Sequence, residues 1–168
     1  MNLKIRAEQP QDYASIHAVV DAAFDGMPYA DGDEAELVSV LRDQSGLAIS
    51  LVAIRDGELV GHIAFSPASA EDGSAPWFAL GPVAVRPDLQ GQGIGSDLIN
   101  QGLALLIEQN ATGCILTGNP NYYRRFGFEL APQNLPVGQP EDYFMVKRLS
   151  SHTPAGPINF HPAFNELS

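Results

Sequence analysis

The chain has 168 residues, of which 45% are hydrophobic and 17% are charged, and its formal net charge at pH 7 is -11. A chain of this length can bury about two thirds of its unfolded surface without covalent cross-links, so we expect one domain over residues 1–168. The strong negative charge argues against nucleic acid as a partner, because phosphates are repelled, and it favours a neutral or cationic partner.

The sequence carries neither a membrane signal nor a cysteine framework. No apolar run approaches the ~18 residues that a membrane helix needs, and residues 1–6 lack the apolar core of a signal peptide. Cys114 is the single cysteine, which rules out an internal disulfide and gives no metal cluster. We therefore expect a cytoplasmic protein that binds no metal and no membrane.

Hydrophobic patterning predicts strands and helices in the first half of the chain. The expected elements are a strand over 3–6, helices over 10–24 and 33–42, and strands over 47–55 and 58–67. Asp56-Gly57 joins the last two strands and is a strong hairpin signal, so these strands are expected to be antiparallel. On the first helix, Tyr13 is assigned to the apolar face together with Ile16 and Val20.

The second half of the chain is also predicted to contain both strands and helices. The expected elements are a strand over 77–85, a helix over 94–109, a strand over 114–117, a short helix that begins after Asn119, a strand over 143–149, and an extended tail over 150–168 that packs on the body. A right-handed crossover through the long helix makes the strand at 114–117 parallel to the strand at 77–85. Ile107 is assigned to the inward face of that helix, and Cys114 is expected to be a small buried hydrophobe.

A glycine-rich turn separates the strand at 77–85 from the long helix, and we interpret it as an anion cradle. Gly91, Gly93 and Gly95 remove side chains where the backbone has to approach a ligand, and the first N–H groups of the helix lack intrahelical partners. Those amides lie at the positive end of the helix dipole, about half an elementary charge, which favours phosphate or pyrophosphate. The alternative is that these glycines only end one element and start the next.

Spacing separates the known phosphate-binding loops. A dinucleotide fingerprint needs a glycine or alanine where Ser96 stands, and a Walker loop needs Gly-Lys-Ser/Thr, which is absent. The remaining pattern is Arg/Gln-x-x-Gly-x-Gly/Ala after a Val-x-Val strand, and Gln90, Gly93 and Gly95 meet it. This pattern resembles the acetyl-coenzyme A loop of the GNAT superfamily of N-acetyltransferases.

A second motif adds to that resemblance. GNAT enzymes commonly carry Tyr-x-x-x-Gly-Phe after the fifth strand, and the sequence over 123–128 reproduces it. The longer form Gly-Asn/Asp-Pro-x-Tyr-Tyr-x-x-Phe-Gly-Phe, with a tail like that over 160–164, is similar to the bacterial YhbS-type branch. The two motifs occur in order, and the resemblance extends over essentially the whole chain.

The resemblance implies an α/β (α+β) fold with a central mixed, mostly antiparallel sheet that is flanked by helices and whose fourth and fifth strands splay apart. Acetyl-coenzyme A (acetyl-CoA) would enter that gap as co-substrate, without a metal. Its pantetheine would pair with backbone groups of Val83 and Val85. Asn119 would either contact the cofactor or only cap the short helix. The residues implied in cofactor binding are Val83, Val85, Gln90, Gly91, Gln92, Gly93, Ile94, Gly95, Ser96 and Asn119.

The implied reaction is transfer of an acetyl group from acetyl-CoA to a primary amine of a small molecule or protein, by direct attack in a ternary complex. By its register in the motif, Tyr123 would serve the departing thiolate as general acid or hydrogen-bond donor. Adjacent residues on a helix point about 100° apart, so Tyr122 and Tyr123 cannot both face the site. Arg124 and Arg125 either reach the adenosine 3′-phosphate or are only solvated.

The base that deprotonates the amine is left open by the sequence. GNAT enzymes often use a carboxylate on or before the fourth strand, and residues 77–85 contain no acid. The candidates are His62, Glu34, Glu36, Glu71, Asp72 and a chain of waters. Acids on and between the first two helices, Asp21, Asp25 and Asp31 among them, either attract a cationic amine or only solvate the surface.

The absence of an obvious base keeps a second class of function open, a non-catalytic domain that binds or senses acyl-CoA. A transferase that uses a longer acyl donor, including an acyl group on a carrier protein, is a further alternative. Tyr123 favours the enzyme, because a binding domain has no need of a phenol beside the thioester. The acceptor, the pathway and the oligomeric state, with a homodimer among the options, are left open.

Overall fold

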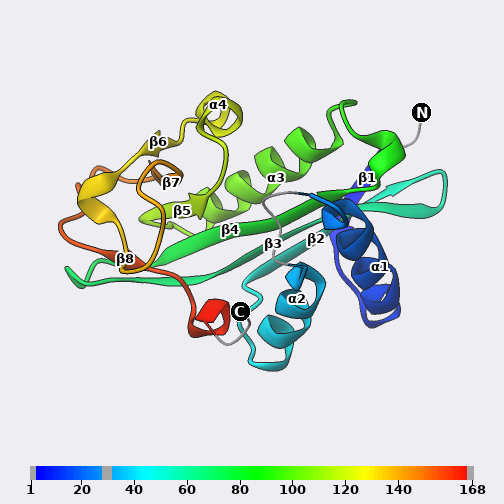
Figure 1. The fold of residues 1–168 in the computed structure, drawn as a ribbon, viewed down its shortest axis with the longest axis horizontal. Helices are drawn as coiled ribbons and strands as arrows, with labels where there is room; N and C mark the ends of the chain where they lie inside the picture. The colour runs from blue at the N-terminus through cyan, green and yellow to red at the C-terminus, as the bar shows by residue number, and fades with distance from the viewer. Residues whose placement is uncertain (1–2, 28–31, 166–168) are drawn as a thin grey trace. The chain divides into compact units, whose positions relative to one another are not determined.

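The structure, a computed structural model, describes residues 3–27 and 32–165 (Figure 1). The chain divides into two compact units, of which the first consists of Met1–Phe65, Gly81–Leu103 and Pro162–Ser168, and the second of Ser66–Leu80 and Ala104–His161. Three elements contribute residues to both units: β3 (Glu58–Ala70), β4 (Trp77–Val85) and α3 (Ile94–Glu108). Within the described ranges, no helix has the length and apolar character needed to cross a membrane.

Antiparallel strands form the sheet of the first unit. β1 (Leu3–Ala7) pairs with β2 (Ile49–Arg55), and β2 pairs with β3 through the predicted turn at Asp56-Gly57. Both turn residues have positive φ, 52° and 83°, as the common two-residue hairpin turn requires. The register places Val52 between Arg6 and His62 on neighbouring strands, so these three side chains project from the same face of the sheet.

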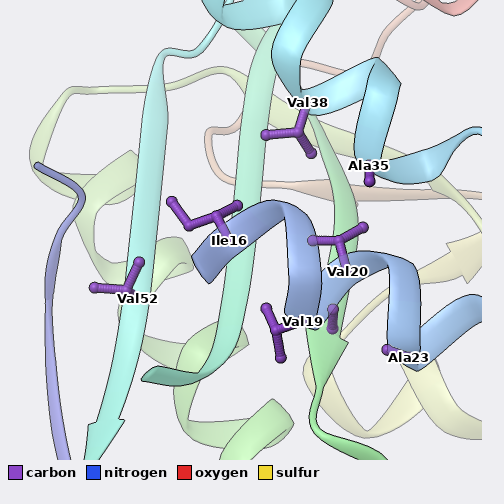
Figure 2. Packing of buried hydrophobic residues seen from close by; sticks show 8 residues of the cluster. Ile16, Val19, Val20, Ala23, Ala35, Val38 and Val52 are labelled. Atoms are coloured by element: carbon purple, nitrogen blue, oxygen red, sulfur yellow. The ribbon is translucent and has the colours of Figure 1, made fainter. Parts of the chain in front are cut away.

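Two helices pack on that face and form the core of the first unit, α1 (Tyr13–Phe24) and α2 (Glu34–Asp43). The buried cluster shown in Figure 2 contains Ile16, Val19, Val20, Ala23, Ala35, Val38, Val52 and Ala84. Proline suits the first turn of a helix, and Pro10 opens a 3-10 turn, Pro10–Asp12, that leads into α1. α3 covers the opposite face, where a Cβ on Gly61 would lie 3.1 Å from the Leu98 side chain.

Two expectations about buried faces were wrong. Tyr13 is 40% exposed, and the Arg42 guanidinium lies 3.9 Å above its ring centroid. This cation–π contact at the first residue of α1 takes the place of burial in the core. Ile107 is 56% exposed because it lies about 100° around α3 from its neighbour Leu106, which is fully buried.

The second unit contains the remaining strands. β5 (Gly113–Thr117) pairs with β7 (Phe144–Arg148), which also pairs with the two-residue β6 (Glu129–Leu130). The tail forms β8 (Ile158–Asn159), which pairs with the end of β3 and extends that strand to Ala70, beyond the predicted end at 67. Cys114 is buried as expected. The buried core of this unit contains Trp77, Ala79, Ile115, Ala131, Phe144, Val146 and Ile158.

The strands follow the hydrogen-bonded order β1-β2-β3-β4-β5-β7-β6, and β4 and β5 are parallel. The predicted mixed, mostly antiparallel sheet is therefore confirmed. Pairing between β4 and β5 is confined to Trp77–Ala79 and Gly113–Ile115. β4 continues to Val85 without further pairing to β5 among the described residues, as expected where the fourth and fifth strands splay.

Candidate functional site

The glycine-rich loop follows β4 in the first unit. A 3-10 turn, Pro87–Leu89, leads into it, and α3 begins at Ile94. Gly91 and Gly93 have φ values of 80° and 88°, in the left-handed region that glycine enters without strain. A Cβ on either residue would meet nothing within 4 Å, so the backbone conformation, rather than a lack of space, demands glycine there. No described residue covers these two positions.

The first turn of α3 presents backbone N–H groups beside this loop. The Asp97 N–H donates to the Gly93 carbonyl at 3.0 Å and closes the first helical turn. The preceding amides, those of Ile94, Gly95 and Ser96, have no acceptor inside the helix, as at any helix start. With the helix dipole they favour an anion, so the loop has the backbone geometry that an anion cradle needs.

Both glutamines of the loop use their side chains to brace it. Gln90 Nε2 donates to the Val85 carbonyl at 3.1 Å, and Arg55 Nη1 donates to Gln92 Oε1 at 2.9 Å. The Gln90 side chain thus ties the loop back to the end of β4, and the Gln92 side chain ties it to the end of β2. The contribution of these two residues to a bound cofactor therefore rests on their backbone groups.

Arg86 anchors the other end of the loop. Its guanidinium binds Asp88 at 2.7 Å and Glu58 at 2.9 Å. Hydrogen bonds to Asp88 first, and then to Glu58, raise the pKa of Arg86. Two carboxylates balance this positive charge, so the attraction of the loop for an anion depends chiefly on its amides.

Val83 and Val85 lie half-buried on β4, on either side of the buried Ala84. Among the described residues, β4 makes no pair with β5 beyond Ala79. Apart from the Val85 carbonyl, which accepts the Gln90 side chain, the backbone N–H and C=O groups along that edge of β4 are therefore suited to pair with an added strand.

Asn119 and Tyr123 flank and end α4 (Pro120–Tyr123) in the second unit. Asn119 Oδ1 accepts the Asn121 N–H at 2.9 Å, so the expected short helix has the expected cap. Gly127, with a φ of 91°, ends the 3-10 turn that follows. The side-chain oxygen of Asn119 serves the helix cap, and its NH₂ group is what it offers to a ligand.

Tyr123 is half-buried among aromatic rings. Its ring centroid lies 5.0 Å from that of Tyr122 and 6.2 Å from that of Phe128. A Cβ on Gly118 would lie 2.6 Å from the Tyr123 ring, so the position of the ring requires glycine at 118. Burial, and to a smaller extent the neighbouring Tyr122, raises the pKa of the Tyr123 phenol. The phenol therefore keeps its proton at neutral pH, which is the state that a proton donor needs.

The two arginines that follow α4 are exposed. The Arg125 guanidinium lies 4.7 Å above the Tyr122 ring centroid, which orients that side chain by a cation–π contact. Arg124 and Arg125 thus lie on the surface of the second unit. A surface position is compatible with both alternatives, phosphate binding and solvation.

Two candidate bases of the second unit, Glu71 and Asp72, hold the tail. Asp72 accepts hydrogen bonds from Ser74, from His152 and from a backbone amide of the tail. These bonds, the one from Ser74 first, hold the pKa of Asp72 well below its ordinary value. Glu71 accepts a hydrogen bond from Asn159 at 3.2 Å. A carboxyl group with a strongly lowered pKa is a weak base, so Asp72 is poorly suited to take a proton from an amine.

An acidic hollow of about 200 Å³ lies in the first unit beside α1 and α2. It is lined by Asp21, Phe24, Asp25, Gly26, Met27, Gly32 and Glu34. Glu36 is exposed on α2, and Asp31 lies outside the described residues. In residues 3–27 and 32–165, no group of three or more His, Cys, Asp or Glu side chains is placed to hold a metal ion.

His62 is fully buried in β3 and belongs to a polar chain that was not predicted from the sequence. Its Nε2 lies 2.8 Å from Ser50 Oγ, which donates to Glu8 Oε1 at 2.6 Å. Arg42 binds both carboxylate oxygens of Glu8, at 2.8 and 3.0 Å. These residues come from β3, β2, the end of β1 and α2. No local sequence pattern predicts that these residues are neighbours; that prediction would need the register of the strands.

Comparison with known proteins identifies the family. Residues 14–128 match the family described as Acetyltransferase (GNAT) family. The chain is 34% identical over 170 residues to YhbS of Escherichia coli strain K12, an uncharacterized N-acetyltransferase, with 97% of this chain and 99% of YhbS covered. The chain therefore belongs to the GNAT family of acetyltransferases, and the resemblance to the YhbS-type branch is confirmed.

Two solved structures share the fold over nearly the whole chain. The crystal structure of E. coli YhbS in complex with CoA matches with a TM-score of 0.89 at 32% identity, covering 100% of this chain and 94% of that one. A GNAT family acetyltransferase from Brucella melitensis, crystallised with acetyl-CoA, matches with a TM-score of 0.86 at 43% identity, covering 97% and 98%. The GNAT fold expected from the motifs is thereby confirmed.

Proposed function

We propose that this protein transfers the acetyl group of acetyl-CoA to a primary amine of a small molecule or peptide, by direct attack in a ternary complex. Membership of the GNAT family supports the reaction class, and the two structural relatives were crystallised with CoA and with acetyl-CoA. The observation in this chain that carries the proposal is the loop before α3. There Gly91 and Gly93, both left-handed, precede the first amides of a long helix, which have no acceptor inside that helix.

In this proposal the backbone amides of 92–96 bind the pyrophosphate, and the backbone of Val83 and Val85 pairs with the pantetheine. Gln90 holds the end of β4, and Gly91 shapes the turn. The net charge of -11 opposes an anionic ligand, but salt screens exposed charges beyond about 10 Å, so the local amides decide. In the second unit, the NH₂ group of Asn119 is the candidate cofactor contact.

Tyr123 is proposed to supply the proton for the leaving group. As the amine nitrogen forms its bond to the thioester carbonyl carbon and the C–S bond breaks, the Tyr123 hydroxyl donates a proton to the sulfur. It regains one from the nitrogen, which becomes an amide. Burial raises the pKa of Tyr123, so the phenol is protonated before reaction and has a proton to give. A group in this role typically contributes about 10²- to 10⁴-fold in rate.

The acidic hollow supports an acceptor that arrives as a cation. A primary amine is an ammonium ion at neutral pH, and Asp21, Asp25 and Glu34 provide carboxylates that attract it. The ammonium must lose a proton before its nitrogen can attack the thioester. The proposed reaction therefore requires a proton acceptor as well as Tyr123.

Release of free thiol from acetyl-CoA tests the proposal, with butylamine, putrescine, spermidine and a short peptide with a free amino terminus as acceptors. We expect amine-dependent release that falls at least tenfold in Gly93→Glu, because a carboxylate in the cradle repels the pyrophosphate. Gly73→Glu is the control, since Gly73 lies in a turn of the second unit with a similar φ of 82° and open space around it. Absence of amine-dependent release in the wild type would contradict the proposal.

A further inference from the structure

A cavity of about 580 Å³ lies within the second unit, and the proposed acetyl transfer uses none of the residues that line it. Residues of β6 and β7 line one side of this cavity, and residues from 133–134 and 150–154 line the other. Sites for small molecules typically have volumes of about 300–1,000 Å³. The cavity is therefore large enough to hold a small molecule.

Two side chains of opposite charge line the cavity, those of Glu129 and Arg148. Glu129 pairs with Val146, which lies two residues before Arg148 on β7, so all three side chains project from the same face of the sheet. Glu129 and Arg148 are both exposed, so a ligand can reach them from solvent. In residues 3–27 and 32–165, neither side chain forms an ion pair.

The backbone of Arg148 offers a further donor at the edge of the cavity. Leu149 donates its N–H to a carbonyl just before β5, so the backbone groups of Arg148 turn the other way, toward β6. β6 begins at Glu129, opposite Val146, and does not extend to Arg148. Gly127 lies at that place in the register and ends a 3-10 turn instead of continuing the strand. The Arg148 N–H therefore has no backbone acceptor in the described part of the chain.

The tail orients the Arg148 guanidinium. Arg148 Nη1 donates to Thr153 Oγ1 at 2.7 Å, which leaves the other guanidinium N–H groups and the Thr153 hydroxyl proton for a ligand. Asn134 is 1% exposed and donates to the carbonyls of Pro154 and Gly156, at 3.2 and 2.9 Å, so the tail is fixed beside the cavity. A side chain that is already held in place loses less freedom when it binds a ligand.

The spacing of the two charges suits a ligand that carries both signs. Glu129 lies diagonally across from Arg148, and diagonal neighbours on antiparallel strands are about 7–8 Å apart. Charge-assisted hydrogen bonds are about 2.7–2.9 Å long, so a carboxylate and an ammonium on one carbon atom can span the two residues. The guanidinium is also matched to a carboxylate, which it binds through two parallel hydrogen bonds.

We propose that this cavity binds a free α-amino acid with an apolar side chain. Arg148 binds the α-carboxylate and Glu129 binds the α-ammonium group. The apolar part of the lining, which includes the buried Ala131 and Val146, contacts the side chain of the ligand. A ligand with only one of the two charges leaves either Glu129 or Arg148 unpaired, so the site selects a zwitterion.

This site is distinct from the residues of the second unit that are assigned to acetyl transfer. Arg148 pairs with Gly113 at the start of β5, whereas Asn119 and Tyr123 follow the other end of that strand. A strand rises about 3.3 Å per residue, so the two ends of β5 are about 13 Å apart. The amino acid is therefore a second ligand and not the acetyl acceptor, and the proposal does not depend on the proposed transfer.

The test is an NMR titration of the ¹⁵N-labelled protein without acetyl-CoA, followed through the backbone amide signals of Gly127 and Arg148. The probes are L-leucine, L-leucinamide, which lacks the carboxylate, and N-acetyl-L-leucine, which lacks the ammonium group. We expect L-leucine to shift both signals with a dissociation constant of about 1 mM or below, and the two derivatives to bind at least tenfold more weakly. Glycine, which lacks the apolar side chain, should bind about fivefold more weakly than L-leucine.

Two variants match each charge of the site to one charge of the probe. Arg148→Gln should weaken L-leucine binding at least tenfold and remove the preference over L-leucinamide, whereas Glu129→Gln should remove the preference over N-acetyl-L-leucine. Glu108→Gln is the matched control, since it changes an exposed carboxylate at the end of α3 outside the cavity, and it should leave the affinity unchanged.

Several results would overturn the site, and the comparison of the probes needs no variant. Equal affinities for L-leucine and its two derivatives would show that the two charges do not bind the ligand. Unshifted signals of Gly127 and Arg148, or an unchanged affinity for L-leucine in Arg148→Gln, would show that the amino acid does not bind in this cavity. Each of these results leaves the proposed acetyl transfer untouched, because no acetyl-CoA is present.

Discussion

Gly93→Ala is the substitution whose effect follows most directly from the loop geometry. Gly93 has a φ of 88°, and its added Cβ meets nothing within 4 Å, so the cost comes from the backbone alone. An L-residue in the left-handed region costs about 1–2 kcal/mol. If the loop relaxes to avoid this strain, the cofactor must restore the left-handed conformation when it binds. The affinity for CoA should then fall by about 5- to 30-fold.

Gly73→Ala is the matched control for this prediction. Gly73 has a φ of 82° and nothing within 4 Å of its Cβ position, but it lies in a turn of the second unit. Both variants should lose unfolding free energy in urea, whereas only Gly93→Ala should lose CoA affinity in calorimetric titration. An unchanged dissociation constant in Gly93→Ala, or an equal loss in Gly73→Ala, would refute the assignment of this loop to the cofactor.

Two further predictions concern single side chains. Tyr123→Phe should lower turnover at least tenfold with little change in acetyl-CoA affinity, because it removes the proton for the thiolate but keeps the ring. Steady-state kinetics measure the turnover and calorimetry measures the affinity. An unchanged rate would remove Tyr123 from the mechanism. For His62, the folded-state pKa of about 4 lies below the unfolded value of 6.5, so its stabilising effect is complete above pH 6.5 and is lost as the pH falls toward 4. Between pH 6.5 and pH 5 the wild type should lose about 2 kcal/mol more unfolding free energy than His62→Gln, and parallel losses in urea titrations would show that the histidine is not held neutral.

Much of the fold could be predicted because its signals are local. The hairpin at Asp56-Gly57 and the strand over 77–85 have the predicted positions, since turn chemistry and apolar patterning act within a few residues. The extension of β3 to Ala70 was missed because β8, far along the chain, supplies the pairing. Tyr13 was misplaced because its ring stacks with Arg42 at the start of α1, and Ile107 because it lies about 100° around α3 from the buried Leu106.

In the candidate site, too, local features could be predicted from the sequence and non-local ones could not. The left-handed glycines and the start of α3 lie in one short stretch, so spacing alone was enough to suggest an anion cradle. The cap of α4 by Asn119 was equally readable. The link from Glu8 through Ser50 to His62 joins β2 and β3 to the residue that follows β1, and it depends on side-chain rotamers, which no pattern in the sequence reports. Such non-local hydrogen bonds need the register of the sheet before they can be inferred.

The measurement that tests the central claim most directly is ¹³C NMR of the protein with acetyl-CoA labelled at the acetyl carbonyl and an amine of the panel. The proposed function predicts that the thioester carbonyl signal disappears while an amide carbonyl signal of equal intensity appears, with one free thiol for each amide. A labelled signal that remains on the thioester indicates a domain that only binds acyl-CoA, and one that moves to acetate indicates hydrolysis. Either result would contradict transfer to an amine.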